Sequence, residues 1–276
     1  MADILAPFLL PEGFERPRLR ALTHEGSVMC EAGRLVLHRG ARKRADRRRS
    51  WAERPRPRRA EPVLLVPGFL AGDWTLRALA AELRSEGFRT YRSGILANVS
   101  CTLDAAALVE ARLESIVERR DARVHVVGHS LGGMIARGVA VRRPDLVAGV
   151  VTMGSPIMAP AAHHKVLTGG VHMLATLSSV GVPGVMSRQC VGGACAEASF
   201  TEAQTPLPAG IGLTNVYSQR DGIVDWQACI DPAGEPVEVT ASHIGMALDP
   251  QVARAVTAAL VGAGEVSVEV DRGKTA

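Results

Sequence analysis

The 276-residue sequence predicts an α/β fold, with a mainly parallel central sheet, helices on both faces and a helical cap insertion. Two observations support this. From residue 61 onward, short apolar runs alternate with stretches of helical periodicity, which is typical of βαβ units. The runs are also apolar throughout rather than alternating, as expected for strands buried on both faces. Apolar residues make up 47% of the chain, enough for a substantial core.

The elements follow from local composition. Strands are predicted in six short segments: "PVLLVPGF" (62–69), "RTYRS" (89–93), "RVHVVG" (123–128), "LVAGVVTMGSP" (146–156), "GLTNVYS" (212–218) and "PVEVTAS" (236–242). Helices are predicted in four segments with apolar residues at helical spacing: 74–88, 103–120, 131–143 and 250–262. Gly87 and Pro144 end two of these helices, and Pro250 lies in the first turn of the last one.

The N-terminal part differs from the rest. A short amphipathic helix is predicted, capped by Thr23 and ended by Gly40. Residues 39–60 form an extended, Arg/Pro-rich arm with a local charge of +9, against +4 for the whole chain. Such an arm is either a solvated linker or a contact for an anionic membrane surface. Nucleic-acid binding is not expected.

We therefore expect four segments: an N-terminal helical extension (1–38), the basic linker (39–60), the main domain (61–262, with a cap at about 157–208) and a C-terminal tail (263–276). No apolar run reaches the roughly 18 residues of a membrane-spanning helix. The start of the chain lacks the basic and apolar regions of a signal peptide. These features predict a cytoplasmic protein, with peripheral membrane contact through the arm as an alternative.

Five cysteines do not make a disulfide scaffold in a chain of this length. The pair in "CVGGAC", Cys190 and Cys195, is close enough to bridge across a glycine turn. A disulfide and two free thiols are both compatible with this spacing.

A serine enclosed by glycines marks the candidate chemistry. "GHSLG" (128–132) fits the pattern G-x-S-x-G directly after a predicted strand and directly before a predicted helix. The sharp turn strains the serine backbone and brings Gly128 and Gly132 so close that side chains there would collide. Ser130 is thereby lifted above the sheet at a helix N-terminus, where developing negative charge is favoured.

A serine hydroxyl needs a base and an orienting acid. His243 is the predicted base, because it follows a late strand and precedes the last helix. The acid is expected between serine and histidine, which makes Asp221 the candidate and leaves Asp225 to cap a helix. The remaining downstream histidines are expected on the lid surface rather than in a zinc site: His163, His164 and His172. His129, next to the serine, is expected to pack or cap.

Two backbone N–H groups are predicted to form an oxyanion hole. One belongs to Leu131, which follows the serine, and the other to Phe69, in the loop after the first core strand. Gly68 is expected to give that loop the freedom to aim its donor.

Four motifs together, "VPGF", "GHSLGG", "YSQRDGIVDW" and "SHIGM", resemble the α/β-hydrolase superfamily, and most of all its bacterial lipase and esterase members. The resemblance covers about residues 61–262. It implies a triad of Ser130, Asp221 and His243, with no metal and no organic cofactor. One departure is Pro67, where many relatives carry a histidine, but a backbone donor at Phe69 does not depend on it.

The resemblance also implies a cap over the active site, whose apolar residues would line a substrate pocket. The predicted pocket residues are Leu70, Met158, Met173, Leu174, Leu177, Val185, Met186 and Ile244, and flexible methionines would suit varied acyl chains. A cap that packs only on the core is the alternative. The expected reaction is hydrolysis of esters with apolar acyl groups, by an esterase or lipase. An acyltransferase with the same triad and a non-catalytic lipid-binding protein are the competing functions.

Overall fold

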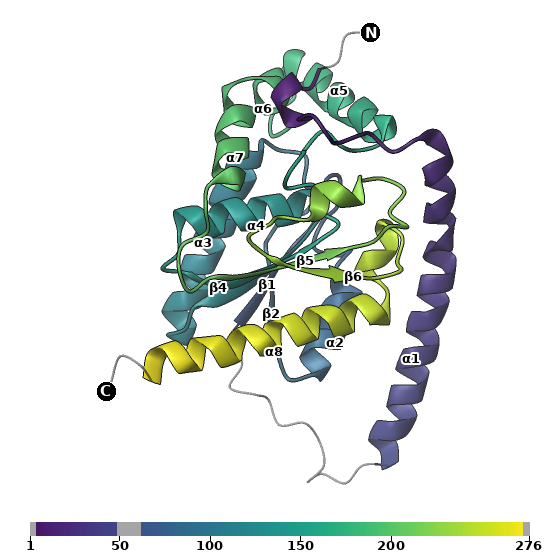
Figure 1. Cartoon of the computed structure of the whole chain (residues 1–276), viewed down its shortest axis with the longest axis vertical. Coiled ribbons are helices and arrows are strands. Elements are labelled where there is room, and N and C mark those ends of the chain that lie inside the picture. The colour runs from purple at the N-terminus through teal and green to yellow at the C-terminus, as the bar shows by residue number, and fades with distance from the viewer. Residues whose placement is uncertain (1–3, 49–61, 273–276) are drawn as a thin grey trace.

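The computed structural model describes residues 4–48 and 62–272, with side chains described for 4–45 and 62–262. Six parallel strands form one sheet in the order β2-β1-β3-β4-β5-β6 (Figure 1). Their bounds are β1 Pro62–Val66, β2 Arg89–Arg92, β3 Val124–His129, β4 Val147–Met153, β5 Gly212–Tyr217 and β6 Glu235–Glu238. All six predicted strands are therefore confirmed, and the central β1, β3 and β4 are buried along their whole length.

Helices cover both faces of the sheet. Apolar residues of α2 (Arg77–Ser85) and α8 (Pro250–Arg272) pack on one face, where Leu83, Val252 and Val256 are fully buried. Apolar residues of α3 (Thr102–Arg120) and α4 (Leu131–Arg142) pack on the other. This layering buries both faces of the apolar strands and is the predicted α/β architecture.

The predicted cap is helical. Between β4 and β5 the chain forms α5 (Lys165–Ser179), α6 (Arg188–Gly192) and α7 (Ala194–Gln204). These helices lie beyond the carboxyl ends of the strands, where open α/β sheets bind their ligands (Figure 1).

The predictions for both ends of the chain are partly wrong. A 3-10 helix at Leu19–Ser27 precedes α1 (Val28–Arg48). Thr23 therefore lies inside the 3-10 helix instead of capping a helix, and Gly40 lies inside α1 instead of ending it. Residues 39–48 are helical rather than extended, because a run rich in arginine and alanine continues α1. The final helix α8 likewise continues to Arg272, beyond the boundary predicted at residue 262.

The N-terminal segment packs along the whole domain. A short 3-10 helix at Pro7–Leu9 lies against the cap, and α1 runs down one side of the molecule beside α8 (Figure 1). Residues 49–60 of the predicted arm lie outside the described residues, so its membrane contact stays a prediction. Within the described ranges, no helix is both long and apolar enough to cross a bilayer.

Candidate active site

Ser130 lies at the sharp turn between β3 and α4. Its backbone has φ 52° and ψ −124°, a conformation that L-residues rarely adopt. Two of the described non-glycine residues besides Ser130 have positive φ, Leu70 and Asp121. Strain of this kind persists only where the surrounding structure enforces it, and it occurs mainly at functional sites.

The two glycines around Ser130 are required by close backbone packing. A Cβ atom at Gly128 would lie 2.3 Å from the Gly132 carbonyl oxygen, and one at Gly132 would lie 2.2 Å from the Val66 carbonyl oxygen. Both distances are far below van der Waals contact. The structure therefore confirms that side chains at these two positions would collide with neighbouring backbone. At Gly132 the backbone that leaves no room is the end of β1.

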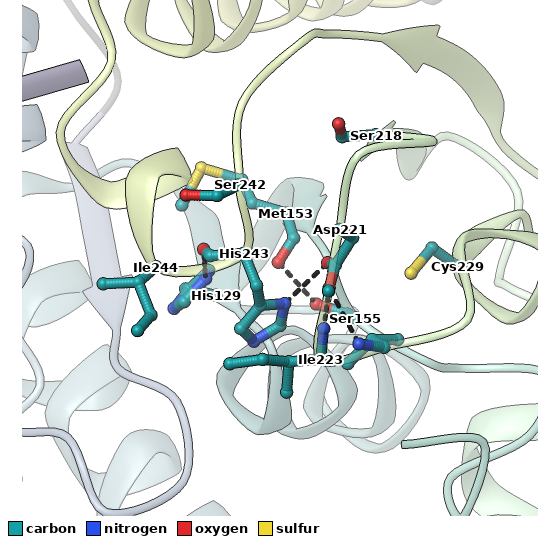
Figure 2. Close-up of polar contacts among 12 residues, drawn as sticks. His129, Met153, Ser155, Ser218, Asp221, Ile223, Cys229, Ser242, His243 and Ile244 are labelled. Carbon is teal, nitrogen blue, oxygen red and sulfur yellow. Dashed lines mark hydrogen bonds and ion pairs between the residues drawn. The ribbon is translucent and has the colours of Figure 1, made fainter. Parts of the chain in front are cut away.

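His243 and Asp221 form a buried pair (Figure 2). The His243 Nδ1–H donates to Asp221 Oδ2 at 2.6 Å, which directs the free Nε2 away from the acid. Burial acts to lower the pKa of His243, but the charge and hydrogen bond of Asp221, together with the charge of Glu25, outweigh it and raise this pKa. The pair is thus arranged to accept a proton at Nε2.

Ser130 and His243 line the same cavity, of about 330 Å³, which is also lined by Gly68, Leu70 and Trp74. No hydrogen bond joins the Ser130 hydroxyl to His243 among the residues described. Catalytic hydrogen bonds are often long in enzymes without substrate and tighten only when substrate binds. The structure therefore brings the three predicted side chains to one site, with Asp221 and His243 in direct contact.

Asp221 and Asp225 have different surroundings. Asp221 Oδ1 accepts hydrogen bonds from the amides of Ile223 (2.9 Å) and Val224 (2.7 Å), so both carboxylate oxygens are engaged. Asp225 instead caps the short helix Trp226–Cys229 through the Gln227 amide. The cap predicted for Asp225 is confirmed.

His129 supports the backbone of His243. Its Nε2–H donates to the His243 carbonyl at 3.0 Å, and the two rings lie 4.8 Å apart (Figure 2). Burial, followed by the nearby His243, lowers the pKa of His129 to about 3, so this ring is neutral. The packing role predicted for His129 agrees with these contacts.

Two backbone N–H groups next to Ser130 have no acceptor within the described residues: those of Phe69 and Leu131. The loop that carries Phe69 is held by the buried Asn98. Its side-chain amide donates to the Pro67 carbonyl at 2.9 Å, and its backbone exchanges bonds with Leu70 and Ala71. A Cβ at Gly68 would lie 3.0 Å from the Ser130 Cβ, so this glycine permits close approach to the serine.

A second cavity, of about 100 Å³, extends from Ser130 beneath the cap. Met186 lines it, and Leu70 and Ile244 line the larger cavity, as predicted. Five other predicted pocket residues line neither cavity: Met158, Met173, Leu174, Leu177 and Val185. Met173 and Leu177 point to solvent, whereas Leu174 is buried inside the cap, because α5 presents a different face to the site. Val185 packs inside the cap as well.

Two of the histidines that were expected on the lid surface have other positions. His163 and His164 are buried rather than on the lid surface. His163 forms a β-bridge with Val224, and the His164 amide donates to the Ile223 carbonyl, which joins the cap to the Asp221 loop.

Several residues that line or support the site were not predicted from the sequence. Leu5 and Leu9 from the N-terminal segment, with Met134, Leu167 and Val171, line the cavity under the cap. Glu25 and Glu31 bind the loop that carries His243. No local pattern marks Glu25 and Glu31, because their partners lie more than 200 positions away in the chain.

The comparisons with known proteins agree with this fold. A family model described as the alpha/beta hydrolase fold matches residues 101–171, which include the strand, the serine turn and the following helix. The chain therefore has the α/β-hydrolase fold. A Vibrio cholerae protein named triacylglycerol lipase is 34% identical to this chain over 99 residues, so the match spans 34% of this chain and only 31% of that relative.

Solved structures share the fold over most of the chain. The mature form of a Bacillus licheniformis lipase matches with a TM-score of 0.58 and 14% identity, over 75% of this chain and 94% of that one. A metagenomic carboxyl esterase matches with a TM-score of 0.55 and 18% identity, over 77% and 76% of the two chains. At these identities the likeness concerns the fold.

Proposed function

We propose that this protein belongs to the α/β-hydrolase superfamily and is a serine esterase or lipase that cleaves carboxylic esters with apolar acyl groups. The observation that carries the proposal is the buried His243–Asp221 pair at 2.6 Å, placed on the same cavity as the strained Ser130. A nucleophile at a helix N-terminus, a neutral imidazole and an orienting carboxylate are the parts that acyl transfer requires.

The proposed reaction has two halves. His243 Nε2 takes the proton of the Ser130 hydroxyl, whose oxygen attacks the ester carbonyl. The N–H groups of Phe69 and Leu131 stabilise the resulting oxyanion, and His243 then protonates the leaving alcohol. Water activated by the same histidine attacks the acyl-serine, which releases the acid and restores Ser130.

The two cavities that meet at Ser130 support an ester substrate with two arms. The cavity beneath the cap is lined mainly by aliphatic side chains, including Leu9, Val171 and Met186, and suits the acyl chain. The larger cavity runs past His243, which must protonate the alcohol, and suits the leaving group. The names of the Vibrio cholerae and Bacillus licheniformis relatives support the same substrate class.

Hydrolysis of p-nitrophenyl esters of graded chain length tests the proposal. We expect saturable turnover that Ser130→Ala abolishes, with the highest kcat/KM for an acyl chain that fills the cavity under the cap. Enlarging this cavity by Met186→Ala should shift the preference toward longer chains. Equal rates for wild type and Ser130→Ala would overturn the proposal.

A further inference from the structure

Three cysteines lie together where the cap meets the body of the molecule. Cys101 directly precedes α3, whereas Cys190 and Cys195 belong to α6 and α7 of the cap. All three Sγ atoms lie within 4.8 Å of one another. Cys101 is buried, the other two are half-buried, and no disulfide joins them in the structure.

The arrangement has the features of a metal site. Zinc–sulfur bonds of about 2.3 Å place thiolates roughly 3.8 Å apart around a tetrahedral ion, which requires only a small contraction of the cluster. The Cys190–Cys195 spacing is of the C-x4-C type, within the range used by zinc ligands, and the third ligand comes from a distant element. Three thiolates leave a fourth coordination position for an oxygen ligand. Water could fill it, or Ser187 Oγ, which lies 3.3 Å from Cys190 Sγ.

We propose that Cys101, Cys190 and Cys195 bind one Zn²⁺ ion that fastens the cap to the N-terminus of α3. Binding releases three protons, one from each thiol, to solvent and involves no oxidation. A disulfide is the competing use of this cluster, but it would engage two of the three sulfurs.

The test uses the full-length protein, equilibrated with ZnSO₄ and then freed of unbound metal. Elemental analysis should find about one zinc per chain in wild type and less than a tenth of that in Cys190→Ser and in Cys195→Ser. Cys30→Ser, at the exposed cysteine of α1, is the matched control and should keep its zinc. Cobalt substitution of wild type should give a sulfur-to-cobalt charge-transfer band and needs no variant.

Two results would overturn the zinc site. One is wild-type protein that retains neither zinc nor cobalt. The other is a disulfide-linked peptide between any two of the three cysteines in non-reducing peptide mapping of the freshly purified chain.

A separate observation concerns residues 19–48, the part of the N-terminal segment that forms the 3-10 helix Leu19–Ser27 and α1. Glu25 Oε1 accepts hydrogen bonds from the amides of Gly222 (2.9 Å) and His243 (3.0 Å), and Oε2 accepts from Ile244 (3.0 Å). One carboxylate therefore joins the loop of the predicted acid to the loop of the predicted base. Ala21 approaches so closely that a Cβ at Gly222 would lie 2.3 Å from its carbonyl oxygen.

Glu31, in α1, adds a second contact to the same loop. Its side chain is completely buried, and it accepts hydrogen bonds from the Ser242 amide at 2.8 Å and the Ser242 hydroxyl at 2.7 Å. Arg34 forms an ion pair with Asp249 at 2.6 Å just beyond that loop. Buried carboxylates with several partners hold a loop rigidly, because every lost bond leaves a polar group unsatisfied.

We infer that Glu25 is a positioning residue for the reaction, because its hydrogen bonds set the placement of His243 against Asp221. The charge of Glu25 also contributes to the raised pKa of His243. This inference rests on the proposed function. In Glu25→Gln one oxygen is replaced by an NH₂ group that cannot accept the bonds of the carboxylate, and the negative charge is lost. We expect kcat to fall about 10- to 100-fold with little change in KM, as for a small misplacement of a catalytic group.

Histidine NMR distinguishes this inference from the proposed function, since it follows the titration of His243 without turnover. The pKa of His243 should fall in Glu25→Gln and stay unchanged in Glu12→Gln, a control at an exposed residue of the same N-terminal region. An unchanged titration and an unchanged kcat in an active Glu25→Gln enzyme would overturn the positioning role alone. A wild-type protein without esterase activity would overturn the proposed function, while the NMR titration would still decide whether Glu25 sets the pKa.

Discussion

Replacement of Asp221 by asparagine tests the acid–base pair with the least disturbance of shape. Asp221 Oδ1 accepts two backbone N–H groups, from Ile223 and Val224, while Oδ2 accepts the His243 Nδ1–H. In the asparagine side chain the carbonyl oxygen must therefore take the place of Oδ1, where it accepts the two amides, because an NH₂ group there would face two donors. The NH₂ group then faces His243, whose Nδ1 has to accept a hydrogen bond.

This reversal sets the size of the effect. A His243 ring that accepts at Nδ1 carries its proton on Nε2 and cannot take the proton of Ser130. The loss of the correct tautomer lowers kcat about 10⁴-fold in a serine protease, equivalent to roughly 5 kcal/mol of barrier. Because the 2.6 Å pair here is also buried, we expect a loss of about 10³- to 10⁴-fold in kcat for Asp221→Asn, with little change in KM.

The assay is steady-state hydrolysis of a p-nitrophenyl ester by folded protein, with folding checked by circular dichroism. Asp225→Asn is the matched control, because it lies in the same loop and serves as a helix cap. This control should keep its kcat and lose at most about 1 kcal/mol of stability. An Asp221→Asn enzyme within tenfold of wild type would refute the reasoning from tautomers.

Two further predictions concern the base and the turn. The pKa of His243 is raised, and only the neutral ring acts as a base. We therefore expect kcat/KM to fall as the pH drops through a value above the ordinary histidine pKa of about 6.5. A flat profile between about pH 5 and 8 would contradict this. Gly132→Ala places a methyl group against the Val66 carbonyl, so the free energy of unfolding should fall by about 2 kcal/mol or more in urea titrations. Gly262→Ala, in α8 with open space around it, is the control and should lose no stability.

Local patterns in the sequence were sufficient to predict the sheet and the serine turn. A parallel strand buried on both faces requires a continuous apolar run, and β1, β3 and β4 each have one. Gly128 and Gly132 mark the turn because no other residue fits between the two backbones. The order of the motifs along the chain was enough to select Asp221 and His243, which the structure places in contact.

The pocket and the N-terminal segment could not be predicted in the same way. Which face of α5 turns inward depends on packing against the body, so Met173 and Leu177 face solvent although their composition suits a pocket. Glu25 and Glu31 lie about 200 residues before the loops that they bind, and nothing in their local sequence indicates those partners. Only the folded chain shows that this segment belongs to the site.

Covalent labelling of Ser130 tests the central claim most directly. A fluorophosphonate reacts with a serine hydroxyl only where a base activates it and an oxyanion hole receives the phosphoryl oxygen. Mass spectrometry of the labelled wild-type protein should find one adduct, on the peptide that contains Ser130, with loss of esterase activity in proportion to labelling. An unlabelled Ser130 in folded wild-type protein, or hydrolysis that persists in Ser130→Ala, would contradict the account.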